Sequence, residues 1–124
     1  RDAMAGGPIK VNGDGTTVRS YLYTADLAIW LWTILLRGAS NRPYNVGSPN
    51  AVSIAQLAET VSRSLPGGVE VQIAQKPVPG QSAARYVPDT ARAELELGLR
   101  EWVPLDEAIR RTAQWHQKTS QEPR

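Results

Sequence analysis

Polar and apolar positions alternate along the first part of the chain in the manner of β-strands. Residues 9–11 alternate in this way, and residues 17–23 do so again after a glycine-rich turn. In the second stretch, Arg19 shares one face with Tyr21 and Tyr23. The pattern predicts two short strands, the second of which presents a guanidinium flanked by two phenols.

The next segment, residues 25–37, is apolar on almost every side of the helix that it predicts. Thr24 is placed to cap the start of this helix and Gly38 to end it. Asp26 and Thr33 are its only polar positions before the last. A helix of this length is too short to span a bilayer, and one apolar on all faces must be covered on all faces. We expect the chain to supply only one of the covering layers.

Helices and strands alternate through the rest of the chain. Ser53 with Gln56 forms a capping box before an amphipathic helix that Pro66-Gly67-Gly68 ends. The further expected elements are a short strand at 43–46, a half-buried strand at 69–73, a loop at 76–81, a short helix from Asp89 to Gly98 and a last helix that starts near Pro104. This alternation favours an α/β fold with some parallel pairing. We expect one domain over residues 1–118 and a frayed polar tail over 119–124.

Composition narrows the class of protein. The 124 residues are 41% apolar and 21% charged, which is typical of one globular domain. The absence of cysteine excludes disulfides and thiolate catalysis. No apolar run is long enough to span a membrane and no secretion leader opens the chain, so we expect a cytoplasmic protein. The net charge is +2 and the arginines are scattered, so no nucleic-acid partner is expected.

Few residues carry recognisable chemistry. Gly13-Asp14-Gly15 is not a dinucleotide loop, because Val18 replaces the third glycine and a strand follows instead of a helix. His116 has no partner at ligand spacing, which favours a surface or edge histidine and no metal site. Arg19 is the stronger candidate, since its planar fork fits phosphate oxygens two at a time. The alternative for Arg19 is a surface arginine stacked on its neighbouring tyrosines.

Four ordered motifs point to one family. They are Gly13-Asp14-Gly15 with Arg19, Tyr23 and Asp26; Tyr44-Asn45-Val46-Gly47-Ser48; Ser53-Ile54 with Leu57-Ala58; and Arg85-Tyr86 with Asp89, Leu97-Gly98, Pro104-Leu105 and Trp115. Together they resemble, over about residues 3–116, the extended short-chain dehydrogenase/reductases, the NAD-dependent nucleotide-sugar epimerases and dehydratases.

The resemblance implies a fold and a ligand. The chain would be the C-terminal part of such an enzyme, a small mixed-sheet α/β substrate domain without the N-terminal Rossmann half. Its ligand would be a nucleotide-diphosphate sugar. Arg19 would contact the diphosphate or the nucleoside, Asn45 would lie near the same group, and Val11 would pack beside the base.

The second contact to the diphosphate is less well defined. Many family members carry arginine at the position of Val78, which is apolar here. Lys76 or Arg85 would then supply the second charge. Tyr21, on the face expected for Arg19, would add a hydroxyl donor.

The resemblance also implies which parts lie elsewhere. The family's glycine-rich NAD loop and Tyr-x-x-x-Lys catalytic pair lie upstream of the matched residues, and no tyrosine of this chain has a lysine four positions later. We therefore expect no catalytic, cofactor-binding or metal-binding residue here, and an inactive isolated chain. The parent enzyme would use NAD(P) to epimerise, dehydrate, reduce or decarboxylate its substrate.

The apolar helix predicted over residues 25–37 allows two hypotheses. The missing Rossmann half would cover it, and without that half residues 27–36 would drive self-association. The alternative is a stand-alone, non-catalytic binding domain that recruits a partner through a surface formed by Trp30 and Trp32.

Overall fold

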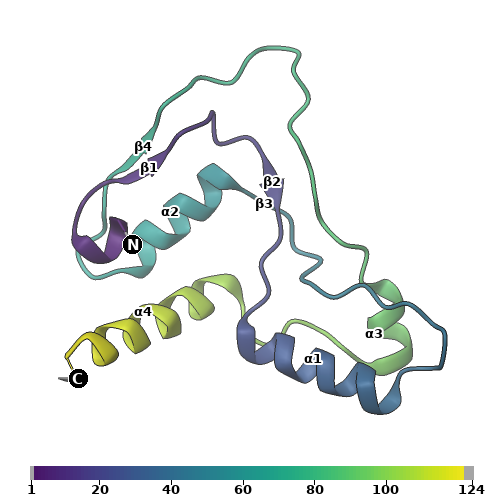
Figure 1. Cartoon of the computed structure of the whole chain (residues 1–124). Helices are drawn as coiled ribbons and strands as arrows, with labels where there is room; N and C mark the ends of the chain where they lie inside the picture. Colours follow the sequence, from purple (N-terminus) through teal and green to yellow (C-terminus); the bar gives the residue numbers. More distant parts are fainter. Residues whose placement is uncertain (1, 122–124) are drawn as a thin grey trace.

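The computed structural model describes residues 2–121, which form two small sheets and several helices (Figure 1). In chain order the elements are η1 (Asp2–Ala5), β1 (Ile9–Val11), β2 (Val18–Arg19), α1 (Thr24–Arg37), β3 (Val52–Ser53), α2 (Ile54–Ser64), β4 (Val71–Ile73), α3 (Ala91–Leu97) and α4 (Leu105–Gln121). This arrangement confirms the predicted small mixed α/β fold.

Each sheet has two strands. β1 pairs with β4 in parallel, and β2 pairs with β3 in antiparallel fashion. The β1–β4 pair confirms the expected parallel pairing. A parallel pair requires a long crossover connection, which here is the stretch of chain between β1 and β4. The strand predicted at 17–23 shrinks to the two residues of β2. The strand predicted at 43–46 is wrong, since this stretch finds no strand partner within residues 2–121.

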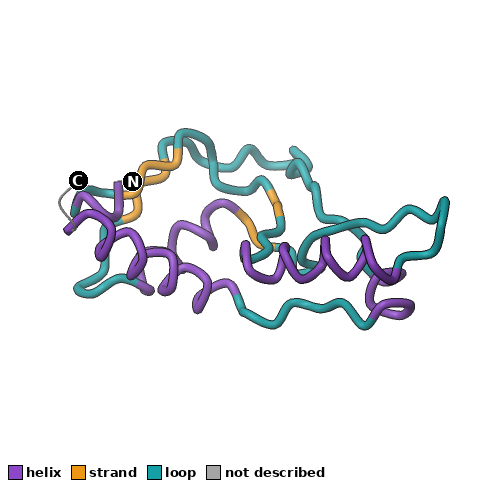
Figure 2. The backbone as a smooth tube through the Cα atoms, turned by 60° about the horizontal axis from the view of Figure 1, so that its bottom comes forward, coloured by secondary structure: helices purple, strands orange, loops and turns teal. Residues whose placement is uncertain are grey.

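The elements gather in two groups (Figures 1 and 2). α2 packs against α4 and against both strands of the β1–β4 sheet, and α1 packs against α3. The β2–β3 pair lies between the groups, so β2 leads from the first group toward α1.

Trp30 forms the centre of the core around α1. Its side chain is fully buried and packs with Ala93, Leu97 and Leu99. Its Nε1 also donates to the carbonyl of Arg100 at 3.0 Å. One side of α1 is therefore covered by its own chain.

The opposite side of α1 is exposed. Trp32 is 63% exposed and Leu36 is 75% exposed. Residues two positions apart in a helix are rotated by about 200° around the helix axis, so Trp30 and Trp32 point to opposite sides. The predicted Trp30/Trp32 surface is therefore wrong for Trp30. The exposed apolar side chains form what we call the α1 face: Ile29, Leu31, Trp32, Leu35 and Leu36.

Helix ends test three predictions. The capping box is confirmed, because the Ser53 hydroxyl accepts from the Gln56 N–H at 3.1 Å and the Gln56 side chain accepts from the Ser53 N–H at 2.9 Å. The Thr24 cap is wrong, since Thr24 is the first helical residue. Gly38 does end α1, and a Cβ there would collide with the carbonyl oxygen of Ile34.

The last helix extends further than predicted. α4 continues to Gln121, so the tail expected over 119–124 is helical for its first three residues, and residues 122–124 lie outside the described part. Within residues 2–121, no helix combines the length and the hydropathy needed to cross a membrane.

Candidate functional site

A cavity of about 480 Å³ opens between β1, β2 and α2. Val11 of β1 and Arg19 of β2 both line it, together with the turn that joins these strands. The wall on the side of α2 is apolar and consists of Ile54, Leu57, Ala58 and Val61. The structure thus brings two of the predicted binding residues, one apolar and one cationic, into a single cavity, which we call the Arg19 cavity.

The turn at the rim of this cavity is held by its own side chains. The Asp14 carboxylate accepts from the backbone N–H of Thr16 at 3.0 Å and from its hydroxyl at 2.8 Å. These bonds, the backbone one first, lower the pKa of the Asp14 carboxyl. Gly15 has φ +75°, and a Cβ there would lie 2.9 Å from the Cβ of Ala55. Glycine therefore lets the turn approach the start of α2 closely.

Arg19 is half-buried and has donors to spare. Its Nη1 donates to the carbonyl of Val18 at 2.9 Å. Among residues 3–119, whose side chains the structure describes, no carboxylate lies at ion-pair distance from its guanidinium. Since guanidinium has five N–H donors, the remaining ones can bind an anion that enters the cavity.

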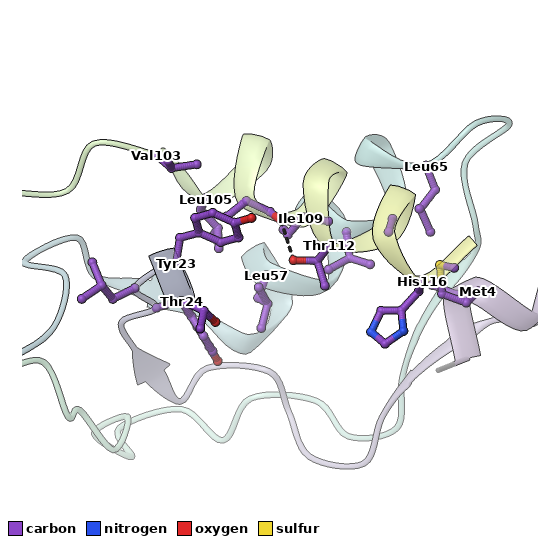
Figure 3. A pocket seen from close by; sticks show the side chains of 16 residues that line it. Met4, Tyr23, Thr24, Leu57, Leu65, Val103, Leu105, Ile109, Thr112 and His116 are labelled. Atoms are coloured by element: carbon purple, nitrogen blue, oxygen red, sulfur yellow. Dashed lines mark hydrogen bonds between the residues drawn. The ribbon is translucent and has the colours of Figure 1, made fainter. Parts of the chain in front are cut away.

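Tyr21 does not share the cavity of Arg19. With Tyr23 it lines a second cavity of about 390 Å³ between α2 and α4, which we call the α2/α4 groove (Figure 3). β2 ends at Arg19, so the strand alternation that would place both tyrosines beside the guanidinium stops there. The predicted face of one guanidinium and two phenols is therefore wrong.

The three other predicted binding residues lie outside the Arg19 cavity. The Asn45 amide donates to the carbonyl of Asp89 at 2.8 Å. Lys76 borders a different hollow, beside Ser53. Arg85 forms a parallel bridge with Val18, and the side chains of paired residues lie on the same face of a sheet. Successive residues of a strand alternate between the two faces, so Arg85 and Arg19 lie on different faces. Their roles in binding stay predictions.

Some residues of the cavity escaped the sequence analysis. Asn12 and Thr17 line it on either side of the turn, and Leu57 lines it from α2. The sequence contains part of this information: Asn12 and Thr17 flank the Gly-Asp-Gly turn, and Leu57 belongs to the apolar stripe of an amphipathic helix. That stripe does not reveal which of its residues face a cavity.

The turn at residues 13–15 does not have the setting of a dinucleotide-binding loop. A pyrophosphate of NAD needs a glycine-rich turn at a helix N-terminus, whereas the turn at 13–15 leads into β2. His116 is exposed and stacks edge-on against Trp115, with ring centroids 4.9 Å apart. In the part of the chain that the structure describes, no three His, Cys, Asp or Glu side chains gather where they could hold a metal ion.

Known proteins match this chain in sequence. The NAD dependent epimerase/dehydratase family matches residues 1–47. A dTDP-glucose 4,6-dehydratase of Neisseria gonorrhoeae is 30% identical, over 93% of this chain and 36% of that protein. In sequence and in fold, the chain is thus similar to the NAD-dependent epimerases and dehydratases among the extended short-chain dehydrogenase/reductases.

Solved structures of extended short-chain dehydrogenase/reductases share the fold. A UDP-N-acetylglucosamine 4-epimerase from Bacillus cereus superposes with a TM-score of 0.80 at 17% identity, over 94% of this chain and 40% of that one. WbmF of Bordetella bronchiseptica, in complex with NAD+ and UDP, gives a TM-score of 0.80 at 24% identity, over 96% of this chain and 34% of that one. The chain thus spans little more than a third of the length of these relatives.

Proposed function

We propose that this chain is the C-terminal, substrate-binding part of an NAD-dependent nucleotide-sugar epimerase or dehydratase. One observation carries the proposal: the half-buried guanidinium of Arg19 lines the same cavity as Val11 and has no carboxylate partner among residues 3–119, whose side chains the structure describes. A half-buried guanidinium that no carboxylate neutralises and that keeps free N–H donors suits an anionic ligand.

The rest of the Arg19 cavity suits a nucleoside diphosphate. Its apolar wall, from Val11 and the α2 residues Leu57 and Ala58, accepts the flat ring of a base. Arg19 binds the diphosphate through its free donors. A volume of about 480 Å³ is within the usual range for small-molecule sites.

Two of the relatives support this class of ligand. One is a dehydratase of dTDP-glucose, and the other was solved with UDP. We therefore expect this chain to bind dTDP or UDP. CDP and GDP are the further nucleotides to be tested. When bound in the parent enzyme, NAD supplies hydride transfer. The residues of this chain bind and orient the nucleotide sugar, and the isolated chain has no turnover of its own.

The α1 face supports the placement of the chain in a longer enzyme. It presents five large apolar side chains to solvent on one helix, which is uncommon on a free surface. The Rossmann half of the enzyme covers this face and supplies the second layer that the helix needs. In the same enzyme that half also holds the cofactor and the catalytic groups.

The proposal is tested by calorimetric titration of dTDP, UDP, CDP and GDP into the wild type and into Arg19→Ala. Loss of the charged hydrogen bonds should weaken binding by about 1.5–3 kcal/mol, roughly tenfold to a hundredfold. Arg63→Ala is the matched control, because Arg63 is an exposed arginine on α2 outside the Arg19 cavity. Equal affinity of wild type and Arg19→Ala for every nucleotide would contradict the proposal.

A second candidate function is a stand-alone interaction domain. The exposed α1 face, which includes Trp32 but not Trp30, favours this second function. The encoding gene separates the two candidates. A reading frame that continues upstream with a strand, a glycine-rich loop and a helix supports the enzyme, and a start codon next to Arg1 supports the interaction domain.

A further inference from the structure

The lining of the Arg19 cavity includes a pair of residues with chemistry of its own, Asn12-Gly13. Both residues are exposed, and both line the cavity. Of the four asparagines in the chain, only Asn12 precedes a glycine. Asparagine followed by glycine cyclises readily, because glycine has no side chain to hinder the approach of its nitrogen to the amide carbon of the asparagine. The pair is therefore a candidate site of deamidation.

Neither of the two reacting groups is restrained by a hydrogen bond. Among residues 3–119, whose side chains the structure describes, the side-chain amide of Asn12 has no hydrogen-bond partner, and neither has the N–H of Gly13. A Cβ at Gly13 would meet no heavy atom within 4 Å, so the backbone has open space in which to turn. The nitrogen of Gly13 can therefore approach the amide carbon of Asn12 without breaking a hydrogen bond of either group.

Two comparable residues each lack one of these conditions. Asp14 also precedes a glycine, but its carboxylate accepts from the N–H and the hydroxyl of Thr16, at 3.0 and 2.8 Å. An ionised carboxylate is also a much weaker electrophile than an amide. Asn41 is exposed, but Arg42 follows it, and the Arg42 N–H donates to a backbone carbonyl at 3.3 Å. Of these three residues, only Asn12 combines a free amide with an unhindered nitrogen in the next residue.

Deamidation of Asn12 would change the charge of the cavity. Two cations, Lys10 and Arg19, and one carboxylate, that of Asp14, line it, which gives a net charge of +1. A carboxylate at position 12 cancels this charge. It would compete with a ligand phosphate for the guanidinium of Arg19, and it would repel the diphosphate directly.

We propose that Asn12 is a site of spontaneous deamidation, and that the carboxylate formed there weakens the binding of nucleoside diphosphates in the Arg19 cavity. The nitrogen of Gly13 attacks the amide carbon of Asn12 and forms a C–N bond, and the amide nitrogen leaves as ammonia with the proton that Gly13 gives up. Water then opens the cyclic imide at either carbonyl, which yields aspartate or isoaspartate. The net reaction converts the amide and one water into a carboxylate and an ammonium ion. The effect on binding rests on the proposed function.

The first experiment follows the purified chain during incubation in mildly alkaline buffer. Peptide mass spectrometry measures the conversion of amide to acid at each asparagine, and enzymatic methylation detects isoaspartate. We expect conversion at Asn12 to be at least about tenfold faster than at Asn41, and Gly13→Ala to slow it by a similar factor, because a methyl group then hinders the attacking nitrogen. Equal rates at Asn12 and Asn41, or an unchanged rate in Gly13→Ala, overturn the proposal.

The second experiment measures the effect of the new carboxylate on binding. The converted chain carries one more negative charge, so ion exchange separates it from the unconverted chain. We expect it to bind dTDP and UDP about tenfold more weakly in calorimetry. Asn12→Asp, which adds the charge without the extra backbone atom of isoaspartate, should reproduce this loss. Equal affinity of the converted and unconverted chains overturns the proposal.

Asn41→Asp is the matched control for charge. It adds the same charge outside the Arg19 cavity, at a residue with φ +56°, a conformation that aspartate also tolerates. We expect it to bind dTDP and UDP like the wild type. A loss as large as that of Asn12→Asp would show that the net charge of the chain, and not the carboxylate in the cavity, weakens binding, and it would overturn the proposal.

The outcomes distinguish this inference from the proposed function. A freshly purified chain that binds none of the nucleotides contradicts the proposed function, and with it the effect of deamidation on binding, whatever the rate at Asn12. Arg19-dependent binding by the fresh chain, with slow conversion at Asn12 or with undiminished affinity after conversion, overturns only the inference about Asn12.

Discussion

The Asp26 carboxylate holds the chain just before α4. Its Oδ2 accepts the backbone N–H of Trp102 at 3.0 Å and that of Val103 at 2.9 Å. Asp26 lies in the first turn of α1 and is 2% exposed. One side chain thus links the first turn of α1 to the turn that positions α4, although 76 residues separate Asp26 from Trp102.

Removing this link should destabilise the fold. Asp26→Ala leaves two N–H groups without their acceptor, and we expect it to lower the free energy of unfolding by about 1.5–3 kcal/mol. Asp26→Asn keeps one acceptor oxygen and should lose less. Urea denaturation measures both variants, with Asp106→Ala as the control, because Asp106 is exposed and pairs only with a neighbour on its own helix. A loss in Asp106→Ala as large as in Asp26→Ala would contradict the role of Asp26.

The sequence predicted elements well where local chemistry decides them. The Ser53 and Gln56 capping box and the stop at Gly38 depend on residues within a few positions of each other, and both are confirmed. Asp26 appeared in the sequence only as a polar residue in an apolar helix. Its partners lie about 76 positions away, and no local pattern encodes such a pairing. The same limit explains why Tyr21 was placed beside Arg19: alternation holds only while a strand continues, and β2 ends at Arg19.

The two tryptophans of α1 should behave differently. Trp30 fills the core, so Trp30→Ala should destabilise the fold by about 3–5 kcal/mol in urea denaturation. Trp32 lies on the exposed α1 face, so Trp32→Ser should leave stability within about 0.5 kcal/mol.

Trp32→Ser should instead reduce self-association of the isolated chain, because it removes the largest side chain from the exposed apolar face. Sedimentation velocity over a range of concentrations measures this. A wild type that stays monomeric at high concentration, or a variant that associates as strongly as the wild type, would contradict self-association through residues 27–36.

Glu96 should make stability fall in acid. Its carboxylate pairs with the guanidinium of Arg42 and accepts from the Tyr44 hydroxyl at 2.9 Å. The bond from Arg42 is the largest cause that lowers the pKa of Glu96 from 4.5 to about 2. Because the folded pKa is lower than the unfolded one, the stabilisation is fully present above pH 4.5 and is lost as the pH falls toward 2.

Glu96→Gln cannot ionise and provides the comparison. The difference in urea midpoint between wild type and this variant should be constant above pH 5 or so and shrink at lower pH. Glu59→Gln is the matched control, an exposed carboxylate whose nearest cation, Arg63, is 3.9 Å away. If the difference keeps the same size down to about pH 2.5, the pair of Glu96 and Arg42 does not contribute in the way described.

Two glycines of the turn beside Arg19 offer a matched pair of substitutions. Gly15 has φ +75°, and a Cβ there would lie 2.9 Å from the Cβ of Ala55, so Gly15→Ala strains the backbone and pushes against the start of α2. Gly13 has no heavy atom within 4 Å of such a Cβ, so Gly13→Ala meets no obstacle. We expect Gly15→Ala to lose about 1–3 kcal/mol of stability in urea denaturation. It should also weaken the binding of dTDP and UDP, because this turn and α2 both line the Arg19 cavity. Gly13→Ala should keep both the stability and the affinity close to those of the wild type, and a Gly15→Ala variant with unchanged affinity would show that the nucleotide binds elsewhere.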